Sequence, residues 1–404
     1  MQDNEKKPAL RFKGFTDPWE QRKFSELVQI ERGGSPRPID DFITDAPNGL
    51  NWVKIGDAPT QGNYITKTAE KIRPEGLSKT REVHPGDLIL SNSMSFGKPY
   101  IMGIDGCIHD GWLLIRNTYG VFDLTFLCHL LGTPQMLSQY RSLAAGSTVN
   151  NLNKELVGNT VVTIPSITEQ RVLGDYLEQL DTLITLHQRK YEKLVNIKKS
   201  MLDKMFPPNG ASVPEIRFKG FTDPWEQRKL KELYFQLTER NTDLLPYQKT
   251  LSVATMSFKT DGNGAADTSL ANYKRLRTGD IAFEGHTSKE FRYGRFVLND
   301  VGDGIMSPRF SALRPLHEMP INFWKYYIHY EPIMRKVLVN STKAGTMMNE
   351  LVINDFLQGS ILVPSMAEQQ AIGRFFKQLD TLITLHQREH IKSILEVKRV
   401  KRNE

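Results

Sequence analysis

The sequence has only two cysteines among its 404 residues, Cys107 and Cys128. Neither has a second cysteine or a histidine at the spacing of a metal-binding motif, which argues against a disulfide framework and a zinc site. Long apolar runs are also missing, and residues 1–7 are polar where a signal peptide would be apolar. We therefore expect a reduced, cytoplasmic protein that holds no metal or cofactor and does not enter a membrane.

Familiar catalytic motifs are missing as well. The sequence contains no Asn-Pro-Pro-Tyr-like tetrapeptide for a flipped base, no phosphate-binding Gly-x-x-x-x-Gly-Lys-Ser/Thr loop and no Gly-x-Ser-x-Gly elbow. Gly97-Lys98-Pro99 lacks both the earlier glycine and the hydroxyl residue of a phosphate loop. These absences favour a protein without a catalytic centre, although a metal-dependent nuclease site without a motif stays possible.

The charge is biased toward the positive. Fifty-three lysines and arginines outweigh 46 acidic residues, giving a formal net charge of +7. This sign suits a protein that meets phosphate, and it argues against an acidic mimic of DNA. The length suffices for two or three domains, each with a core of its own.

The sequence repeats itself. Residues 11–23, RFKGFTDPWEQRK, recur unchanged at 217–229, and QLDTLITLHQR occupies both 179–189 and 378–388. The offset is 206 residues for the first pair and 199 for the second. A period this long exceeds that of a solenoid repeat, so each copy is expected to be a domain-sized unit in a pseudo-twofold protein.

Between these identical segments the copies diverge, but short matches keep the register. They are Gly86-Asp87 with Gly279-Asp280, Phe96-Gly97-Lys98 with Tyr293-Gly294-Arg295, and Gly146-Ser147 with Gly345-Thr346. The variable regions, 24–165 and 230–364, close on similar strands at 161–165 and 360–364. We predict one shared fold with two different surfaces.

Two long helices are the clearest predicted elements. Residues 166–206 contain no proline, begin with the capping-box pattern Ser166-x-x-Glu169 and stop at Pro207-Pro208; Ser365-x-x-Glu368 repeats the pattern. Heptad spacing predicts a helix-pairing seam. If symmetry relates the two halves, the paired helices must run antiparallel, as a coiled coil that holds two domains apart. The seam comprises Leu177, Leu180, Ile184 and Leu194 in one helix and Phe376, Leu379 and Ile383 in the other. His187 and His386 also lie on it, as packed, hydrogen-bonded residues.

The variable regions predict short strands, among them 87–90, 280–283 and 295–298, with a helical stretch at 323–339. The expected fold class is α+β, with two similar domains joined by the helices. The predicted segments are 1–165 for the first domain, 166–206 for the central helix, 207–216 for a linker, 217–364 for the second domain and 365–404 for the C-terminal helix.

This pattern resembles the specificity subunits of type I restriction-modification systems. The resemblance covers nearly the whole chain and is carried by residues 221–230, FTDPWEQRKL, and by both helices from Glu169 and Glu368. It implies that each variable domain is a target recognition domain reading one half of a split sequence in double-stranded DNA. It also implies an antiparallel coiled coil that fixes the gap, two methyltransferase subunits docked on the shared segments, and motor-nuclease subunits in the full complex.

We expect DNA contacts on the loops that match between the copies. The candidates are Ser91, Asn92, Ser93, Lys98, Gly146, Ser147 and Thr148 in the first copy, and His286, Lys289, Arg292, Arg295, Lys343, Gly345 and Thr346 in the second. The alternative for each is a solvated charge or a plain turn. Trp19 and Trp225 are expected to pack against the helices, because identical residues cannot read two different half-sites.

Two other functions stay in view. The first is a single-chain nuclease or methyltransferase with fused recognition domains, for which the repeat leaves no spare segment. The second is an anti-restriction mimic or structural adaptor, which the positive charge disfavours.

Overall fold

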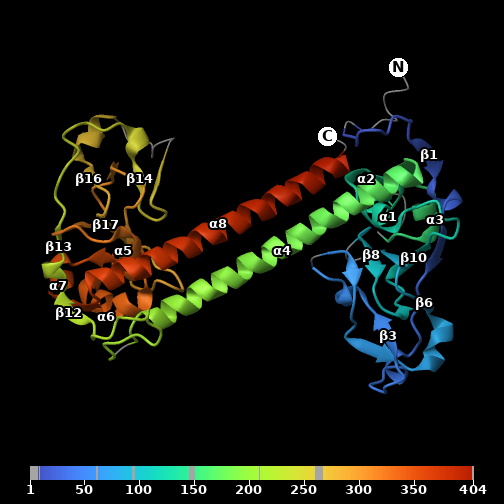
Figure 1. Cartoon of the computed structure of the whole chain (residues 1–404), viewed down its shortest axis with the longest axis horizontal. Coiled ribbons are helices and arrows are strands. Elements are labelled where there is room, and N and C mark those ends of the chain that lie inside the picture. The colour runs from blue at the N-terminus through green and yellow to red at the C-terminus, as the bar shows by residue number, and fades with distance from the viewer. Residues whose placement is uncertain are drawn as a thin grey trace. The chain divides into compact units, whose positions relative to one another are not determined.

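The computed structural model describes residues 8, 10–60, 62–92, 96–144, 151–208, 210–259 and 267–402. The chain divides into a first unit, Met1–Lys190 with His386–Glu404, and a second unit, Tyr191–Leu385 (Figure 1). Each unit contains one α+β domain and part of each long helix. Each long helix therefore contributes residues to both units. The segments expected from the sequence instead treat each helix as a part of its own.

The first domain is built on two sheets. One has the order β2-β10-β7-β8-β4 and the other β5-β3-β9-β6, while β1 and β11 form a separate antiparallel pair. The strands are β1 (Glu20–Lys23), β2 (Gln29–Arg32), β3 (Leu50–Val53), β4 (Tyr64–Ile65), β5 (Glu70–Ile72), β6 (Arg81–Val83), β7 (Leu88–Ser91), β8 (Pro99–Met102), β9 (Gly106–Ile108), β10 (Trp112–Arg116) and β11 (Val161–Ile164). The helices are α1 (Leu124–Leu131), α2 (Pro134–Ala144) and α3 (Lys154–Gly158).

The second domain is built on the sheet β13-β20-β17-β18, with several two-stranded sheets beside it. Its strands are β12 (Glu226–Lys229), β13 (Tyr234–Gln236), β14 (Leu251–Ser252), β15 (Ser257–Phe258), β16 (Lys274–Leu276), β17 (Ile281–Glu284), β18 (Arg295–Leu298), β19 (Gly304–Met306), β20 (Ala312–Pro315), β21 (Thr342–Lys343), β22 (Glu350–Leu351) and β23 (Ser360–Val363). Its helices are α5 (Ile321–Tyr327), α6 (Glu331–Ser341) and α7 (Ile353–Gln358).

The two domains share one topology. The order β2-β10-β7-β8 matches β13-β20-β17-β18, the pair β6 and β9 matches β16 and β19, and the pair β1 and β11 matches β12 and β23. In both domains the two strands that flank the first candidate loop are apolar and largely buried. These strands are β7 and β8 in the first domain and β17 and β18 in the second. The single fold predicted from the repeat is confirmed, and the larger sheet of the first domain has β4 as an additional edge strand.

One predicted helix is wrong. Residues 323–339 form parts of two helices, α5 and α6, which are interrupted between Tyr327 and Glu331. Pro332 lies in the first turn of α6, where its missing N–H is no loss, and its ring would clash with a preceding helical turn. The proline therefore starts a helix and prevents one from running through.

The long helices are α4 (Ile167–Met205) and α8 (Met366–Arg402). They run antiparallel: in the first unit the Tyr176 hydroxyl lies 3.2 Å from the Glu396 carboxylate, and in the second unit Lys198 lies 2.6 Å from Asp380. His187 Nδ1 lies 2.9 Å from His386 Nδ1, so the hydrogen bond expected at these positions is present, between half-buried rings. The helix pair expected from the heptads is confirmed.

The seam residues also contact the domains. Leu177 and Leu180 are buried in the first unit, and their counterparts Phe376 and Leu379 lie in the main core of the second. Ile184 and Ile383 are half-buried, and Leu194 packs against the edge of the second core. No helix among the described residues is long and apolar enough to cross a membrane.

The repeated 13-residue segment is tied to the start of each long helix. Arg11 donates two hydrogen bonds, of 2.8 and 2.7 Å, to the Glu169 carboxylate, and Arg217 does the same to Glu368 at 2.7 and 2.8 Å. Only half of each predicted capping box is therefore present: Ser166 and Ser365 accept the amide three residues on, at 3.4 Å, but the glutamates bind arginine instead of reaching back.

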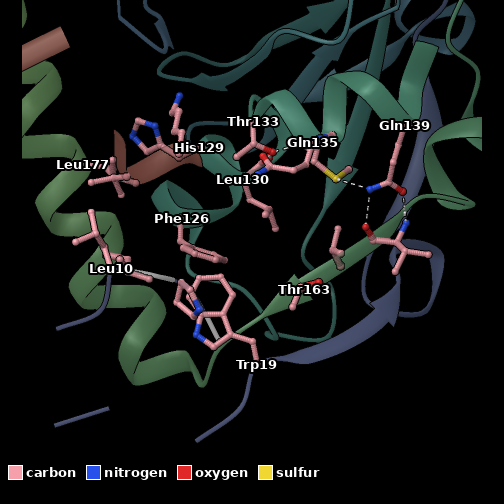
Figure 2. A pocket seen from close by; sticks show the side chains of 17 residues that line it. Leu10, Trp19, Phe126, His129, Leu130, Thr133, Gln135, Gln139, Thr163 and Leu177 are labelled. Carbon is pink, nitrogen blue, oxygen red and sulfur yellow. Dashed lines mark hydrogen bonds between the residues drawn. The ribbon is translucent and has the colours of Figure 1, made fainter. Parts of the chain in front are cut away.

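The repeated tryptophans pack as expected. Trp225 is buried against Phe206 and Phe323, and Trp19 lies edge-on to Phe126 of α1. The repeated tryptophan therefore packs on a helix of its own domain in both units, on Phe323 of α5 and on Phe126 of α1 (Figure 2).

Candidate nucleic-acid interface

The strands that lead into the candidate loops are fixed by equivalent turns. Gly86 and Gly279 both have φ of +94°, a conformation that favours glycine. The aspartate after each glycine accepts a backbone amide, His84 N at 2.9 Å or Arg277 N at 2.7 Å. Each also binds an arginine of the neighbouring strand, Arg116 for Asp87 and Arg314 for Asp280. The two domains thus present their loops from the same scaffold.

In each domain a backbone hydrogen bond links the first candidate loop to a segment that is distant in sequence. In the first domain the Asn92 carbonyl accepts the amide of Leu152 at 2.9 Å, and in the second the Gly285 carbonyl accepts the amide of Asn349 at 2.9 Å. A Cβ added at Gly285 would lie 2.0 Å from the Asn349 carbonyl oxygen, so this approach requires glycine. In each domain, segments about 60 residues apart in sequence therefore lie side by side.

Two candidates of the first domain do not agree with their positions. Ser91 and Asn92 are only 0% and 3% exposed, and the Asn92 amide donates to the Asp110 carbonyl at 2.8 Å. Ser91 is the last residue of the buried strand β7. Both side chains are therefore covered by the protein and are not available to a ligand. The burial of both side chains contradicts their prediction as DNA contacts.

The remaining candidates of the first domain are unequally placed. Lys98 is half-buried, with Nζ 4.9 Å from the centre of the Tyr100 ring. Gly97 before it has φ of +72°, and its counterpart Gly294 has φ of +83°, so both loops turn through a glycine into the next strand. Ser93, Gly146, Ser147 and Thr148 lie outside the described residues.

The second domain presents most of its candidates to solvent. His286, Lys289, Arg292 and Lys343 are exposed, as are Gly345 and Thr346. The ring of His286 contacts the buried carboxylate of Glu284. Within the described ranges, Lys289, Arg292 and Lys343 form no ion pair, so their charges are free to meet phosphate.

Arg295 is held by its own domain. Its guanidinium donates to the Ala254 carbonyl at 3.0 Å and lies 4.8 Å from the centre of the Phe291 ring. These contacts make Arg295 a support for the loop before β18, with only part of the side chain available to a ligand.

A hollow of about 450 Å³ lies between the two loops of the second domain. Gly285, Thr346 and Asn349 line it together with the exposed Arg309, whose guanidinium lies 3.7 Å from the sulfur of Met347. Sequence reasoning missed Arg309 and Asn349. Arg309 precedes β20, and the first copy has Gly111 at the corresponding place, so comparing the copies could not reveal it.

A larger groove of about 1170 Å³ runs along the second unit. Lys289 and Arg295 line it with Lys198 and Lys199 of α4. Lys198 is paired with Asp380, whereas Lys199 is exposed and forms no ion pair with a described residue. Sequence reasoning treated this helix only as a spacer and therefore missed its cations.

The chemistry of these groups suits the binding of a nucleic acid. Lysine and arginine side chains neutralise phosphates, and arginine and asparagine can each form paired hydrogen bonds with base edges. No cluster of three or more histidine, cysteine or acidic side chains suited to a metal ion occurs among the residues that the structure describes.

The comparisons with known proteins agree with this geometry. Residues 16–196 match the family model described as the type I restriction modification DNA specificity domain. The type I restriction enzyme MjaVIII specificity subunit of Methanocaldococcus jannaschii is 22% identical over 381 residues, covering 87% of each chain. A second protein of that organism, described as a type I restriction enzyme MjaX specificity subunit, is 20% identical. The match covers 92% of this chain and 89% of that protein.

A solved structure shares the fold. The S subunit of a type I restriction-modification system from M. genitalium is 13% identical, has a TM-score of 0.59 and covers 98% of both chains. The chain is therefore similar over most of its length to type I restriction enzyme specificity subunits, and its residues 16–196 match the DNA specificity domain of that family.

Proposed function

We propose that each domain reads one half of a divided target in double-stranded DNA and that α4 and α8 set the distance between the halves. The observation that carries the proposal is the duplication of one scaffold with different loops. The turns at Gly86 and Gly279 and the ion pairs of Arg11 and Arg217 are equivalent, whereas the loop residues differ. Equivalent placement with different chemistry suits two similar tasks on two different sequences.

In the second domain the exposed cations and the hollow have different tasks. Lys289, Arg292 and Lys343 would bind phosphates and fix the register of the domain on the duplex. Arg309 and Asn349 at the hollow would read base edges, Arg309 suiting guanine and Asn349 suiting adenine. His286, Gly345 and Thr346 lie on the same pair of loops.

The methyltransferase partners would dock on the identical segments 179–189 and 378–388. In the first, Leu183 and Leu186 are 42% and 43% exposed; in the second, Leu382 and Leu385 are 43% and 49% exposed. Exposed leucines at identical positions of a repeat suit two copies of one partner. We therefore propose two methyltransferase subunits per chain, with motor-nuclease subunits completing the restriction complex, and catalysis by these partners.

A glycine substitution tests the half-site proposal. In Gly285→Ala the new Cβ meets the backbone of Asn349, which displaces the second loop from the first. When the variant is expressed with the cognate methyltransferase subunit, mapping of methylated sites should show relaxed sequence preference in one half of the target only. Gly56→Ala, where an added Cβ meets nothing within 4 Å, serves as the control. A change in both halves would contradict independent reading.

A further inference from the structure

An exposed methionine lies at the tip of a hairpin in the second domain. Strands β21 and β22 pair antiparallel, with Lys343 opposite Glu350, and residues 344–349 connect them. Met347 in this connection is 71% exposed, more than any other large apolar residue that the structure describes. Contact with a ligand would remove this apolar surface from water, so Met347 is a candidate binding residue.

Backbone contacts anchor the tip of the hairpin. The amide of Asn349 donates to the Gly285 carbonyl at 2.9 Å, which joins the tip to the loop after β17. A Cβ on Gly345 would lie 2.4 Å from the Met348 carbonyl oxygen, so the turn around Met347 closes tightly at a glycine. An anchored backbone therefore presents Met347, while its side chain remains in solvent.

The methionine lies beside a group suited to guanine. Met347 and Arg309 both line the hollow of about 450 Å³, and the Arg309 guanidinium donates to the Met347 sulfur at 3.7 Å. The pair presents a charged hydrogen-bond donor next to a polarizable apolar surface. In the major groove of DNA, guanine O6 and N7 match the donor, and the C5-methyl group of a neighbouring thymine matches the apolar surface.

The surroundings of Met347 favour DNA over a protein partner. Among the described residues, no other exposed large apolar residue lies in the two loops, residues 285–294 and 342–351. Met347 is therefore not part of an apolar patch of the kind that marks a protein interface. The two loops and the hollow carry an excess of exposed positive charge, which is complementary to phosphate. The cations are Lys289, Arg292, Lys343 and Arg309, against the exposed carboxylates of Glu290 and Glu350.

We propose that Met347 reads the C5-methyl group of a thymine in the half-site of the second domain, next to the base pair that Arg309 contacts. The inference deepens the proposed function and rests on it. Burial of one methyl group corresponds to about a fourfold gain in affinity. Met347 therefore adds a preference for thymine over cytosine, which lacks this methyl group.

Deoxyuridine tests the inference, because it pairs as thymine does and lacks only the methyl group. The full chain with its methyltransferase subunit binds synthetic duplexes of the mapped motif, in which each thymine of the half-site relaxed by Gly285→Ala is replaced in turn. One replacement should weaken binding by the parent about fourfold. The same replacement should have no effect on Met347→Ala and should still weaken binding by Met347→Leu. Met366→Ala, which removes a methionine that is 49% exposed at the start of α8, should respond as the parent does.

Other outcomes overturn the inference. A half-site without a thymine, or equal sensitivity of the parent and Met347→Ala to every replacement, would show that Met347 does not read a methyl group. Weaker binding by Met347→Ala that is the same on thymine and deoxyuridine duplexes would assign Met347 another role on DNA. Loss of methyltransferase binding in Met347→Ala would assign it to a protein contact. If the parent itself does not prefer the mapped motif over a scrambled duplex, the recognition role fails, and the inference fails with it.

Discussion

Uncompensated cations on the loops of the second domain should contribute to DNA affinity through salt-dependent phosphate contacts. Lys289 is exposed and forms no ion pair with a described residue, so Lys289→Ala should weaken binding to all DNA sequences about equally. The plot of log K against log salt should also become less steep, by about one unit of slope. The measurement is DNA binding at several salt concentrations. Lys231→Ala, which removes an exposed lysine just after the repeated segment, should leave the slope unchanged.

The buried ion pair between Arg217 and Glu368 should be a large contributor to the stability of the second unit. The Glu368 side chain is 1% exposed, so Arg217→Ala would leave its charge without a partner. We expect the free energy of unfolding to fall by about 3–5 kcal/mol in urea titrations. Arg217→Met with Glu368→Gln should recover much of that loss, and a single-variant loss below about 1 kcal/mol would contradict this account.

At the residue scale, the repeat predicted what both copies need and missed what only one copy has. The turn glycines and the repeated tryptophans were predictable because the copies match there. Ser91 and Asn92 were misplaced because polar residues after an apolar strand resemble a loop, whereas here the sheet and the Asp110 loop cover them. Arg309 has no match in the first copy, and its proximity to Asn349 depends on how the loops pack.

Protonation should loosen the helix pair at His187 and His386. Their Nδ1–Nδ1 contact requires one ring nitrogen to donate and the other to accept, so it is lost when both rings are protonated. Burial, followed by the charges of His187 and Lys190, lowers the pKa of His386 below its ordinary 6.5. As the pH falls through 6.5, the unfolded chain therefore binds protons before the folded protein does. The stability that this pair contributes is present above pH 6.5 and is lost as the pH falls toward the lowered pKa of the folded state.

Thermal unfolding between pH 7.5 and 5 measures this effect. The double variant His187→Leu with His386→Leu keeps every other titrating group, so the parent should lose more stability than the variant on acidification. Equal pH dependence in the two proteins would show that the histidine pair does not contribute.

At the element scale, the capping pattern and the proline pair predicted the first long helix to within about one residue of its ends. Residues 166–206 were expected and Ile167–Met205 are helical. The capping boxes were only half right because a distant arginine competes for each glutamate, and no local pattern indicates such a partner. Strand order likewise depended on packing between segments far apart in sequence, although the shared topology followed from the repeat.

At the scale of the whole molecule, the account requires α4 and α8 to determine the gap between two half-sites. Half-sites on one face of DNA lie about one helical turn, ~34 Å, apart, so helix length should translate into base pairs. Seven residues added to each helix lengthen it by about 10.5 Å, close to three base pairs.

Genome-wide methylation mapping tests this claim most directly. The chain is expressed with its cognate methyltransferase subunit and compared with the methyltransferase alone and with the variant lengthened by seven residues in each helix. We predict a split, asymmetric methylated motif that requires the chain, with the same half-sites and a gap about three base pairs wider in the lengthened variant. An undivided motif, or a gap that stays the same while both helices grow, would contradict the account.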